Sequence, residues 1–200
     1  MKVLVISDTH RNISNVEEVL EQVIPRGVTT ILHCGDNIDD ARRLQKLYPE
    51  LTIHAVYGNC DGLGYGDDYT KIVEVGGVPI FMTHGHRYDV KWGDYENLML
   101  DAQAYEAKAA VCGHSHCAHV EKHGSFIVLN PGSMSEPRDG FGYSYAILDI
   151  ENKKITNIAI MQMDRNHCIS MHPACRNVFY KKVKKSVDVC KGLRYNMFCQ

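Results

Sequence analysis

The first 60 residues alternate short apolar runs with segments in which apolar residues recur at helical spacing. The runs 3–6, 30–34 and 53–56 are rich in Val, Ile and Leu and lead into loops, which predicts buried strands. A helix is predicted between the first two runs, from a capping box of Ser14 and Glu17 to Pro25. Its apolar face comprises Val16, Val19, Leu20, Val23 and Ile24. A second helix is predicted from about 39 to 47, and this β-α-β-α-β order favours parallel strands with right-handed crossovers.

The pattern changes after residue 70, where paired strands replace the alternation of strands and helices. Three hairpins are predicted, with turns at residues 76–77, 122–124 and 151–153. Between the first two hairpins, residues 95–109 keep the spacing of an amphipathic helix. Parallel units followed by hairpins predict an α/β protein in which two mixed sheets pack together with helices outside.

Charge divides the chain more sharply than its overall balance of -2 indicates. From Arg165 onward eight residues are basic and Asp188 alone is acidic, which leaves 22 - 8 = 14 basic and 24 - 1 = 23 acidic residues before it. We therefore expect one domain over 1–163 and a basic, Cys-containing extension of unknown role over 164–200. The N-terminus has no signal-peptide pattern, and no apolar stretch approaches the roughly 20 residues that span a bilayer. These features predict a soluble, cytoplasmic protein without a membrane partner, in which eight cysteines do not form a disulfide framework.

Side chains that commonly bind metals follow five of the apolar runs. Because ligand sites in α/β sheets collect at the carboxyl ends of strands, we expect these side chains to meet at one edge. They are Asp8, His10, Asp36, Asn59, His84, His114 and His116. Two carboxylates and several imidazoles suit a pair of divalent cations about 3.5–4 Å apart, with a bridging carboxylate and a bridging hydroxide as nucleophile. The residual positive charge would favour an anionic phosphate, and such ligands suit Mn, Fe, Zn or Ni.

These residues form five motifs in a fixed order. The motifs are Asp8-x-His10, Gly35-Asp36, Gly58-Asn59-Cys60-Asp61, Thr83-His84-Gly85-His86 and Gly113-His114-Ser115-His116. Together they strongly resemble the calcineurin-like metallophosphoesterase superfamily. The short chain and Asn130-Pro131-Gly132-Ser133 resemble its YfcE-type phosphodiesterase branch.

This resemblance covers residues 1–163 and implies a four-layer α/β/β/α sandwich with two metal ions, Mn being the expected metal for activity. It assigns Asp8, His10, Asp36 and His116 to the first metal. Asp36 would bridge to the second metal, which Asn59, His84 and His114 would complete.

Two further residues are candidates for catalytic roles. Many superfamily phosphatases carry a histidine after the asparagine, where it protonates the leaving group, whereas this chain has Cys60. A thiol is a poorer acid near pH 7 than an imidazole, so we hypothesise that Cys60 biases the enzyme toward diesters, although a passive role beside the metals is the favoured alternative. His86 is predicted either to contact the substrate phosphate or to hydrogen-bond a ligand such as His84.

Other polar residues near the motifs are expected to have structural roles. Asp61 should hold its loop through local hydrogen bonds, and Arg138 is assigned to a surface ion pair rather than to the phosphate. His33 and His54 are interpreted as packed or exposed histidines, and residues 130–133 as a turn near the site.

The predicted function is a metal-dependent phosphodiesterase acting on a small phosphorylated substrate, with a homo-oligomer left open. One alternative is a non-catalytic scaffold, since a retromer subunit of this fold serves largely in protein binding. The other is a nuclease, which the acidic body disfavours and the basic segment 181–185 favours. Cys168, His172 and Cys175, with Cys190, superficially suggest zinc, but their spacing fits no common finger.

Overall fold

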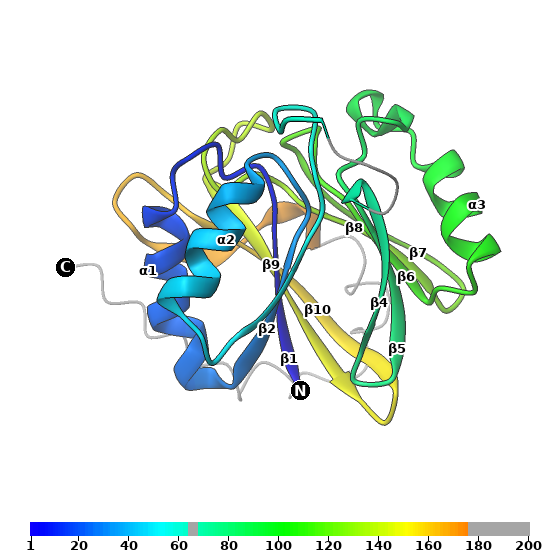
Figure 1. The fold of residues 1–200 in the computed structure, drawn as a ribbon, viewed down its shortest axis with the longest axis horizontal. Coiled ribbons are helices and arrows are strands. Elements are labelled where there is room, and N and C mark those ends of the chain that lie inside the picture. Colours follow the sequence, from blue (N-terminus) through cyan, green and yellow to red (C-terminus); the bar gives the residue numbers. More distant parts are fainter. Residues whose placement is uncertain (64–67, 176–200) are drawn as a thin grey trace.

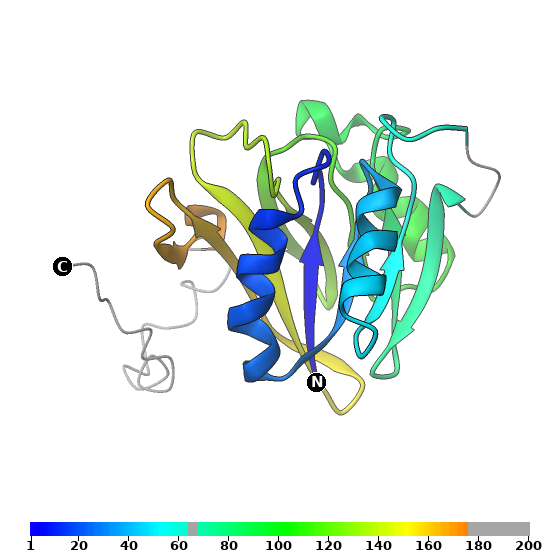
Figure 2. The ribbon, with the colours of Figure 1, turned by 60° about the vertical axis from the view of Figure 1, so that its left-hand side comes forward.

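Two β-sheets pack face to face in the computed structural model, which describes residues 1–63 and 68–175. The first sheet has six strands in the order β11-β10-β9-β1-β2-β3, and the second has five in the order β4-β5-β6-β8-β7. Helices α1 and α2 cover the outer face of the first sheet, and α3 covers the outer face of the second (Figure 1; Figure 2). The predicted four-layer α/β/β/α sandwich is confirmed.

The strands and helices follow the predicted order. The first sheet contains β1 (Lys2–Ile6), β2 (Val28–His33), β3 (Thr52–Ala55), β9 (Tyr143–Glu151), β10 (Lys154–Met163) and β11 (Ile169–Met171). The second contains β4 (Thr70–Val75), β5 (Val78–Thr83), β6 (Ala109–Val111), β7 (Ala118–His123) and β8 (Phe126–Pro131). The helices are α1 (Ser14–Val23), α2 (Ile38–Leu47) and α3 (Glu96–Ala104), with short 3-10 turns η1 (Ile24–Arg26), η3 (Asp89–Trp92) and η4 (Pro173–Cys175). The three predicted hairpins are confirmed as antiparallel pairs.

Alternating side chains of β1 pack into two separate hydrophobic cores. Val3 and Val5 point into the layer between the two sheets, whereas Leu4 and Ile6 pack beneath α1 and α2. All four are fully buried. A third core lies between the second sheet and α3, where Phe81 packs. Because a strand turns successive side chains to opposite faces, a strand buried on both faces reads as a continuous apolar run.

Two local predictions are wrong. Ser14 is the first residue of α1 rather than its cap: the N-cap is Ile13, and no side-chain hydrogen bond caps this end. The helical spacing over 95–109 overstates α3, which ends at Ala104. Glu106 adopts the left-handed conformation at φ 58°, and the Lys108 N–H donates to Pro79 O at 2.8 Å, so the chain turns and joins β6. Tertiary pairing with β5 outweighs the local helical pattern there.

The chain continues the first sheet beyond residue 164. Strand β11 pairs antiparallel with β10, from Met161 opposite Met171 to Met163 opposite Ile169. The turn η4 follows, and Cys175 is buried in the core between the sheets. Residues 176–200, including the basic segment 181–185, lie outside the described residues. Within the described part of the chain, no helix is long and apolar enough to span a membrane.

Candidate metal centre

Five strand ends deliver the predicted ligands to one edge of the sandwich. Strands β1, β2 and β3 run parallel in the first sheet, as β5 and β6 do in the second. The residues that follow these strands are Asp8 and His10 after β1, Asp36 after β2, Asn59 after β3, His84 after β5, and His114 and His116 after β6.

Four of the predicted ligands form a compact group. One ligand atom from each of Asp8, His10, Asp36 and His116 lies within 4.8 Å of all the others. His116 Nε2 is 3.2 Å from Asp8 Oδ1 and 3.3 Å from His10 Nε2, and His10 Nε2 is 3.6 Å from Asp36 Oδ2. Asp8, Asp36 and His116 are buried, and His10 is partly exposed at the rim. These are the four residues that the resemblance assigns to one metal.

The other three predicted ligands lie on the opposite side of Asp36. His84 Nε2 is 3.4 Å from Asp36 Oδ1 and 3.1 Å from Asn59 Oδ1. The ring centroid of His114 is 5.1 Å from that of His84. Asp36 therefore turns one carboxylate oxygen toward His10 and the other toward His84. This placement suits a carboxylate that bridges two cations.

Hydrogen bonds on the far side of two imidazoles set their tautomers. His116 Nδ1 lies 2.6 Å from Glu136 O, and His84 Nδ1 lies 2.8 Å from Cys34 O. Because a carbonyl oxygen only accepts, each Nδ1 must carry the proton that it donates. In its neutral form, a ring held in this way would present an unprotonated Nε2 to the centre, as a metal ligand does. Burial would lower the pKa of His116, but the neighbouring Asp8 outweighs it and raises that pKa.

The backbone at this edge is unusual. Asp8, His10, Asp36, His114 and His116 all adopt positive φ values between 44° and 68°. Left-handed conformations are uncommon outside glycine, although Asp, Asn and His tolerate them better than most residues. Such conformations each cost on the order of 1–3 kcal/mol and cluster at functional sites. Five of the seven predicted ligands therefore sit in conformations that local preference alone does not favour.

Two glycines allow the loops to approach the aspartates. A Cβ atom added at Gly58 would lie 2.0 Å from Asp36 Oδ1, and one added at Gly113 would lie 2.6 Å from Asp8 Oδ2. Neither contact is sterically acceptable, so only glycine fits at these two motif positions. Close packing against the two aspartates therefore explains the glycines that precede Asn59 and His114.

The electrostatics of the centre fit bound cations. Burial alone would raise the pKa of Asp8, but the neighbouring His116 and His84 outweigh it and hold that pKa below its usual value. Burial and the neighbouring His84 lower the pKa of His114 to about 4. Asp8 Oδ1 is buried and accepts no hydrogen bond from the described residues. A buried carboxylate oxygen close to imidazole nitrogens, such as His116 Nε2 at 3.2 Å, is suited to a metal ion.

Comparison with known proteins agrees with this geometry. The family model of the calcineurin-like phosphoesterase superfamily domain matches residues 1–153. The chain belongs to this superfamily. A probable metallophosphoesterase of Bacillus subtilis, YsnB, is 36% identical over 160 residues, covering 78% of this chain and 88% of the relative. The phosphodiesterase YfcE of Escherichia coli is 27% identical over 172 residues, covering 74% of this chain and 88% of the relative. The predicted resemblance to YfcE-type enzymes is confirmed.

A solved structure from the same comparison carries a metal. Vps29 of Entamoeba histolytica complexed with zinc superposes with a TM-score of 0.66 at 25% identity, covering 86% of this chain and 97% of Vps29. The described fold is therefore shared with a protein that was crystallised with a divalent cation.

Residues outside the ligand set support the metallophosphoesterase centre through hydrogen bonds that the sequence did not predict. Ser133 Oγ and Ser135 Oγ both donate to Asp8 O, at 3.0 and 2.8 Å. Asn130 Nδ2 donates to Gly113 O at 2.7 Å and to Ser115 Oγ at 3.0 Å. The predicted turn over residues 130–133 is wrong, because Asn130 and Pro131 are the last residues of β8. The end of this strand and the residues that follow it fix the loops that carry Asp8 and His114. The sequence predicted that residues 130–133 lie near the site. It did not predict the individual hydrogen bonds, which join residues up to 127 positions apart.

The remaining polar candidates take the structural roles expected of them. Asp61 accepts hydrogen bonds from the N–H groups of Ile38 and Gly58, both at 2.7 Å, and so ties its loop to α2. His33 is buried beneath the site, with Nε2 3.1 Å from Thr9 Oγ1. Arg138 is exposed and lies 3.9 Å from Glu136. His54 lies on β3, partly buried.

Cys60 and His86 lie beside the second group of ligands. The Cys60 N–H donates to Asp36 Oδ1 at 3.0 Å, and Cys60 Sγ lies 3.4 Å from Asn59 Nδ2. Partial burial and the carboxylate of Asp36 raise the pKa of Cys60 to about 11. The ring centroid of His86 is 5.5 Å from that of His84, and its buried Nδ1 makes no hydrogen bond with the described residues.

Two residues of the weak zinc pattern, His172 and Cys175, make other contacts. His172 is buried with Nε2 3.3 Å from Asp139 Oδ2, and Cys175 Sγ accepts a hydrogen bond from the Ile160 N–H at 2.8 Å. Among the described residues the single group with metal-site geometry is the one around Asp36. Cys190, the fourth residue of the weak zinc pattern, lies outside the described residues.

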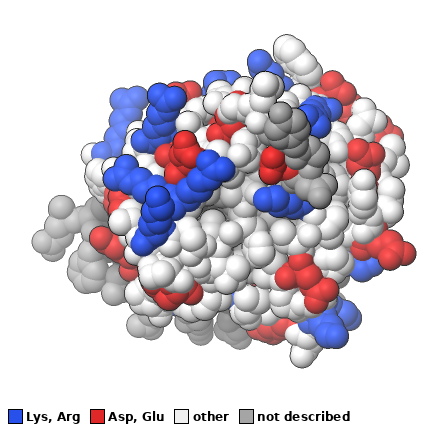
Figure 3. All heavy atoms as spheres, viewed as in Figure 1, with Lys and Arg blue, Asp and Glu red and all other residues white. Residues whose placement is uncertain are grey.

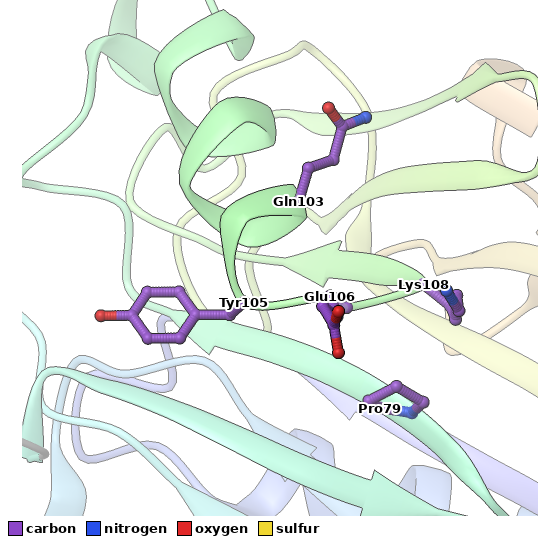
Figure 4. A pocket seen from close by; sticks show the side chains of 6 residues that line it. Pro79, Gln103, Tyr105, Glu106 and Lys108 are labelled. Carbon is purple, nitrogen blue, oxygen red and sulfur yellow. The ribbon is translucent and has the colours of Figure 1, made fainter.

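A surface hollow of about 620 Å³ lies away from this centre. It is lined by Pro79, Gln103, Tyr105, Glu106, Ala107 and Lys108, and the ring of Tyr105 extends beside it (Figure 4). Pro79 is near the start of β5, whereas His84 follows the end of that strand. The hollow is therefore at the opposite end of the second sheet and contains none of the predicted ligands.

Proposed function

We propose that this metallophosphoesterase is a phosphodiesterase with a binuclear metal centre, and the position of Asp36 carries the proposal. Its two oxygens face two separate groups of donors, at 3.6 Å from His10 Nε2 and 3.4 Å from His84 Nε2. One cation would be held by Asp8, His10, Asp36 and His116, and the other by Asp36, Asn59, His84 and His114. When bound, two Mn²⁺ ions would supply a positive site for the phosphate and a bridging hydroxide as nucleophile.

The chain's own residues favour substrates with good leaving groups. Cys60, where many relatives have a histidine, has its pKa raised to about 11 and so remains a weak acid near neutral pH. An acid catalyst works best when its pKa is near the working pH, which makes protonation by Cys60 inefficient. His86, whose ring lies beside that of His84, would donate a hydrogen bond to a phosphate oxygen. Phosphodiesters with activated alcohols are the class that this arrangement supports.

Metal stoichiometry tests the two-site proposal directly. Calorimetric titration of metal-free protein with Mn²⁺ should give two ions per chain. His10→Ala and His84→Ala should each bind one ion, because each removes a ligand from one side of Asp36. Asp36→Asn should weaken both sites, whereas Asp39→Asn, whose side chain is 84% exposed on α2, should match the parent. A single ion per chain in the parent protein would contradict the binuclear proposal.

Turnover tests the reaction itself. With Mn²⁺, the protein should hydrolyse bis(p-nitrophenyl) phosphate faster than p-nitrophenyl phosphate. Asp8→Ala and His116→Ala should abolish this turnover while far-ultraviolet circular dichroism stays unchanged. Full activity in metal-free His116→Ala protein would refute the mechanism.

Assays of metal binding and of phosphoester turnover also distinguish the nuclease and scaffold alternatives. On the face shown in Figure 3, basic side chains gather on the side where α2 lies, and acidic side chains are interspersed with them. Such a mixed surface favours a small substrate over extended duplex binding. Salt-sensitive cleavage of single-stranded oligonucleotides, with no turnover of small diesters, would support the nuclease. Metal binding without hydrolysis of any phosphoester would support the scaffold.

A further inference from the structure

A continuous set of rings extends from the second ligand group toward solvent. The ring of His86 lies 5.5 Å from that of His84 and 6.2 Å from that of His114. The ring of Tyr69 meets His86 nearly edge to face, with centroids 5.7 Å apart. Thr83 Oγ1 donates to Tyr69 O at 3.1 Å, which ties this residue to the end of β5. The backbone of Tyr69 is therefore fixed to the end of the strand that leads to His84.

Arg87 covers the outer end of this set. Its guanidinium carbon lies 4.0 Å from the centroid of the Tyr69 ring, a cation–π contact. Arg87 is exposed, and no carboxylate of the described residues lies within ion-pair distance of it. A guanidinium held over a ring can still direct its N–H donors outward, and a guanidinium binds phosphate with two hydrogen bonds. We call His86, Tyr69 and Arg87 the ring shelf.

The ring shelf lies where part of a substrate would extend. In the proposed function, the phosphate is held beside Asp36 and His84, and each alcohol esterified to it must leave the centre in some direction. The ring shelf begins directly beside His84 and ends in an arginine that is not neutralised by a described carboxylate. A sugar or aromatic group could lie along the rings, and a second anionic group would reach Arg87.

We infer that the ring shelf is a substrate subsite that selects phosphodiesters carrying an additional phosphate on one esterified alcohol. This inference rests on the proposed phosphodiesterase activity and names its substrate class. Arg87 would bind the additional phosphate, Tyr69 would hold the guanidinium in place, and His86 would lie between it and the centre.

A matched pair of substrates isolates the contribution of Arg87. The pair is p-nitrophenyl thymidine 5′-phosphate and the same compound with a phosphate on its 3′-oxygen, and bis(p-nitrophenyl) phosphate serves as a substrate without such a group. The parent protein with Mn²⁺ should show the higher kcat/KM for the 3′-phosphorylated compound. Arg87→Gln should lower that value by at least about 10-fold, mainly through KM, since hydrogen bonds between charged groups are among the stronger ones. The two other substrates should change less than about 2-fold.

Further variants separate a specific contact from general charge loss. Lys91→Gln removes an exposed cation of the same loop, 6.0 Å from the Trp92 ring, and should leave the preference intact. Tyr69→Phe should keep the preference and Tyr69→Leu should reduce it, because the ring holds Arg87. Arg87→Lys should fall between the parent and Arg87→Gln.

The possible failures are distinguishable. If the parent protein with Mn²⁺ hydrolyses none of the three compounds, the proposed function fails. If it hydrolyses bis(p-nitrophenyl) phosphate but Arg87→Gln affects all three substrates equally, or none, the ring-shelf inference fails and the proposed function stands.

Discussion

Binding of Mn²⁺ should raise the thermal stability of this protein, and Asp36 should control the effect. The ligand atoms of Asp8, His10, Asp36 and His116 lie within 4.8 Å of one another in the folded chain. Because the unfolded chain cannot hold these four ligands together, the ion should bind the folded state almost exclusively. A ligand at 100 times its Kd then stabilises the folded state by about 2.7 kcal/mol. For a chain of 200 residues, each kcal/mol shifts Tm by about 2–4 °C, which predicts a rise of about 5–11 °C per site.

Asp36→Asn provides the decisive comparison. The substitution removes the negative charge shared by both ligand groups, so most of the Mn²⁺-dependent rise in Tm should be lost. In metal-free protein the same variant should keep most of the stability of the parent, because Asn keeps an oxygen for the Cys60 N–H at 3.0 Å. Asp39→Asn, three residues away and exposed, should retain the full rise.

Differential scanning calorimetry with and without Mn²⁺, after exhaustive treatment with chelator, gives these values. A rise in Tm that is equally large in Asp36→Asn would show that the stabilising ion binds elsewhere. A parent protein whose Tm does not respond to millimolar Mn²⁺ would refute the proposed centre altogether.

Three further changes test separate features of the structure. Gly58→Ala should abolish Mn²⁺ binding and turnover without unfolding the protein, since its Cβ would lie 2.0 Å from Asp36 Oδ1, whereas Gly62→Ala, with nothing within 4 Å, should be neutral in the same titration. Cys60 is exposed, yet its pKa of about 11 leaves little thiolate. Alkylation of Cys60 by iodoacetamide in metal-free protein at pH 8, followed by peptide mass spectrometry, should be about 100-fold slower than alkylation of a thiol with a pKa near 9. Its rate should rise about tenfold per pH unit, and rapid alkylation at pH 8 would contradict the raised pKa. Burial would raise the pKa of Asp139, but His172 and backbone donors hold it lower in the folded state. This stabilisation is complete above the unfolded pKa of about 3.9 and disappears as pH falls through the lower folded value. In urea unfolding, the destabilisation of Asp139→Asn should therefore be larger at pH 6 than near pH 3, and an equal loss at both would refute the argument.

The sequence was informative where one physical constraint dominated. Strand β1 is buried on both faces, and the run from Val3 to Ile6 therefore left little choice but a central strand. The carboxyl ends of parallel strands share an edge, so the order of strands and ligand-type residues predicted which side chains would meet. The helical spacing of residues 95–109 misled because no local signal reveals that Lys108 hydrogen-bonds Pro79 of β5.

The supports of the centre were less predictable because they join distant residues through single hydrogen bonds. Ser135 and Asp8 are 127 positions apart, and nothing in the composition around Ser135 distinguishes it from an ordinary loop serine. The same holds for His172, which contacts Asp139 from a segment beyond the part of the chain that matches the family model. Such contacts follow from the final packing of the loops rather than from any periodic pattern.

The backbone conformation of the ligands connects these findings to function. Asp8, His10, Asp36, His114 and His116 occupy left-handed conformations that glycine would adopt at lower cost, yet glycine would supply no ligand. Sequences usually agree with local preference, and conflicts of this kind concentrate where function requires a particular side chain. These five residues lie in the loops that follow β1, β2 and β6, where their side chains meet. The folded chain therefore carries this backbone cost, and hydrogen bonds such as those from Ser133 and Ser135 to Asp8 O help to offset it.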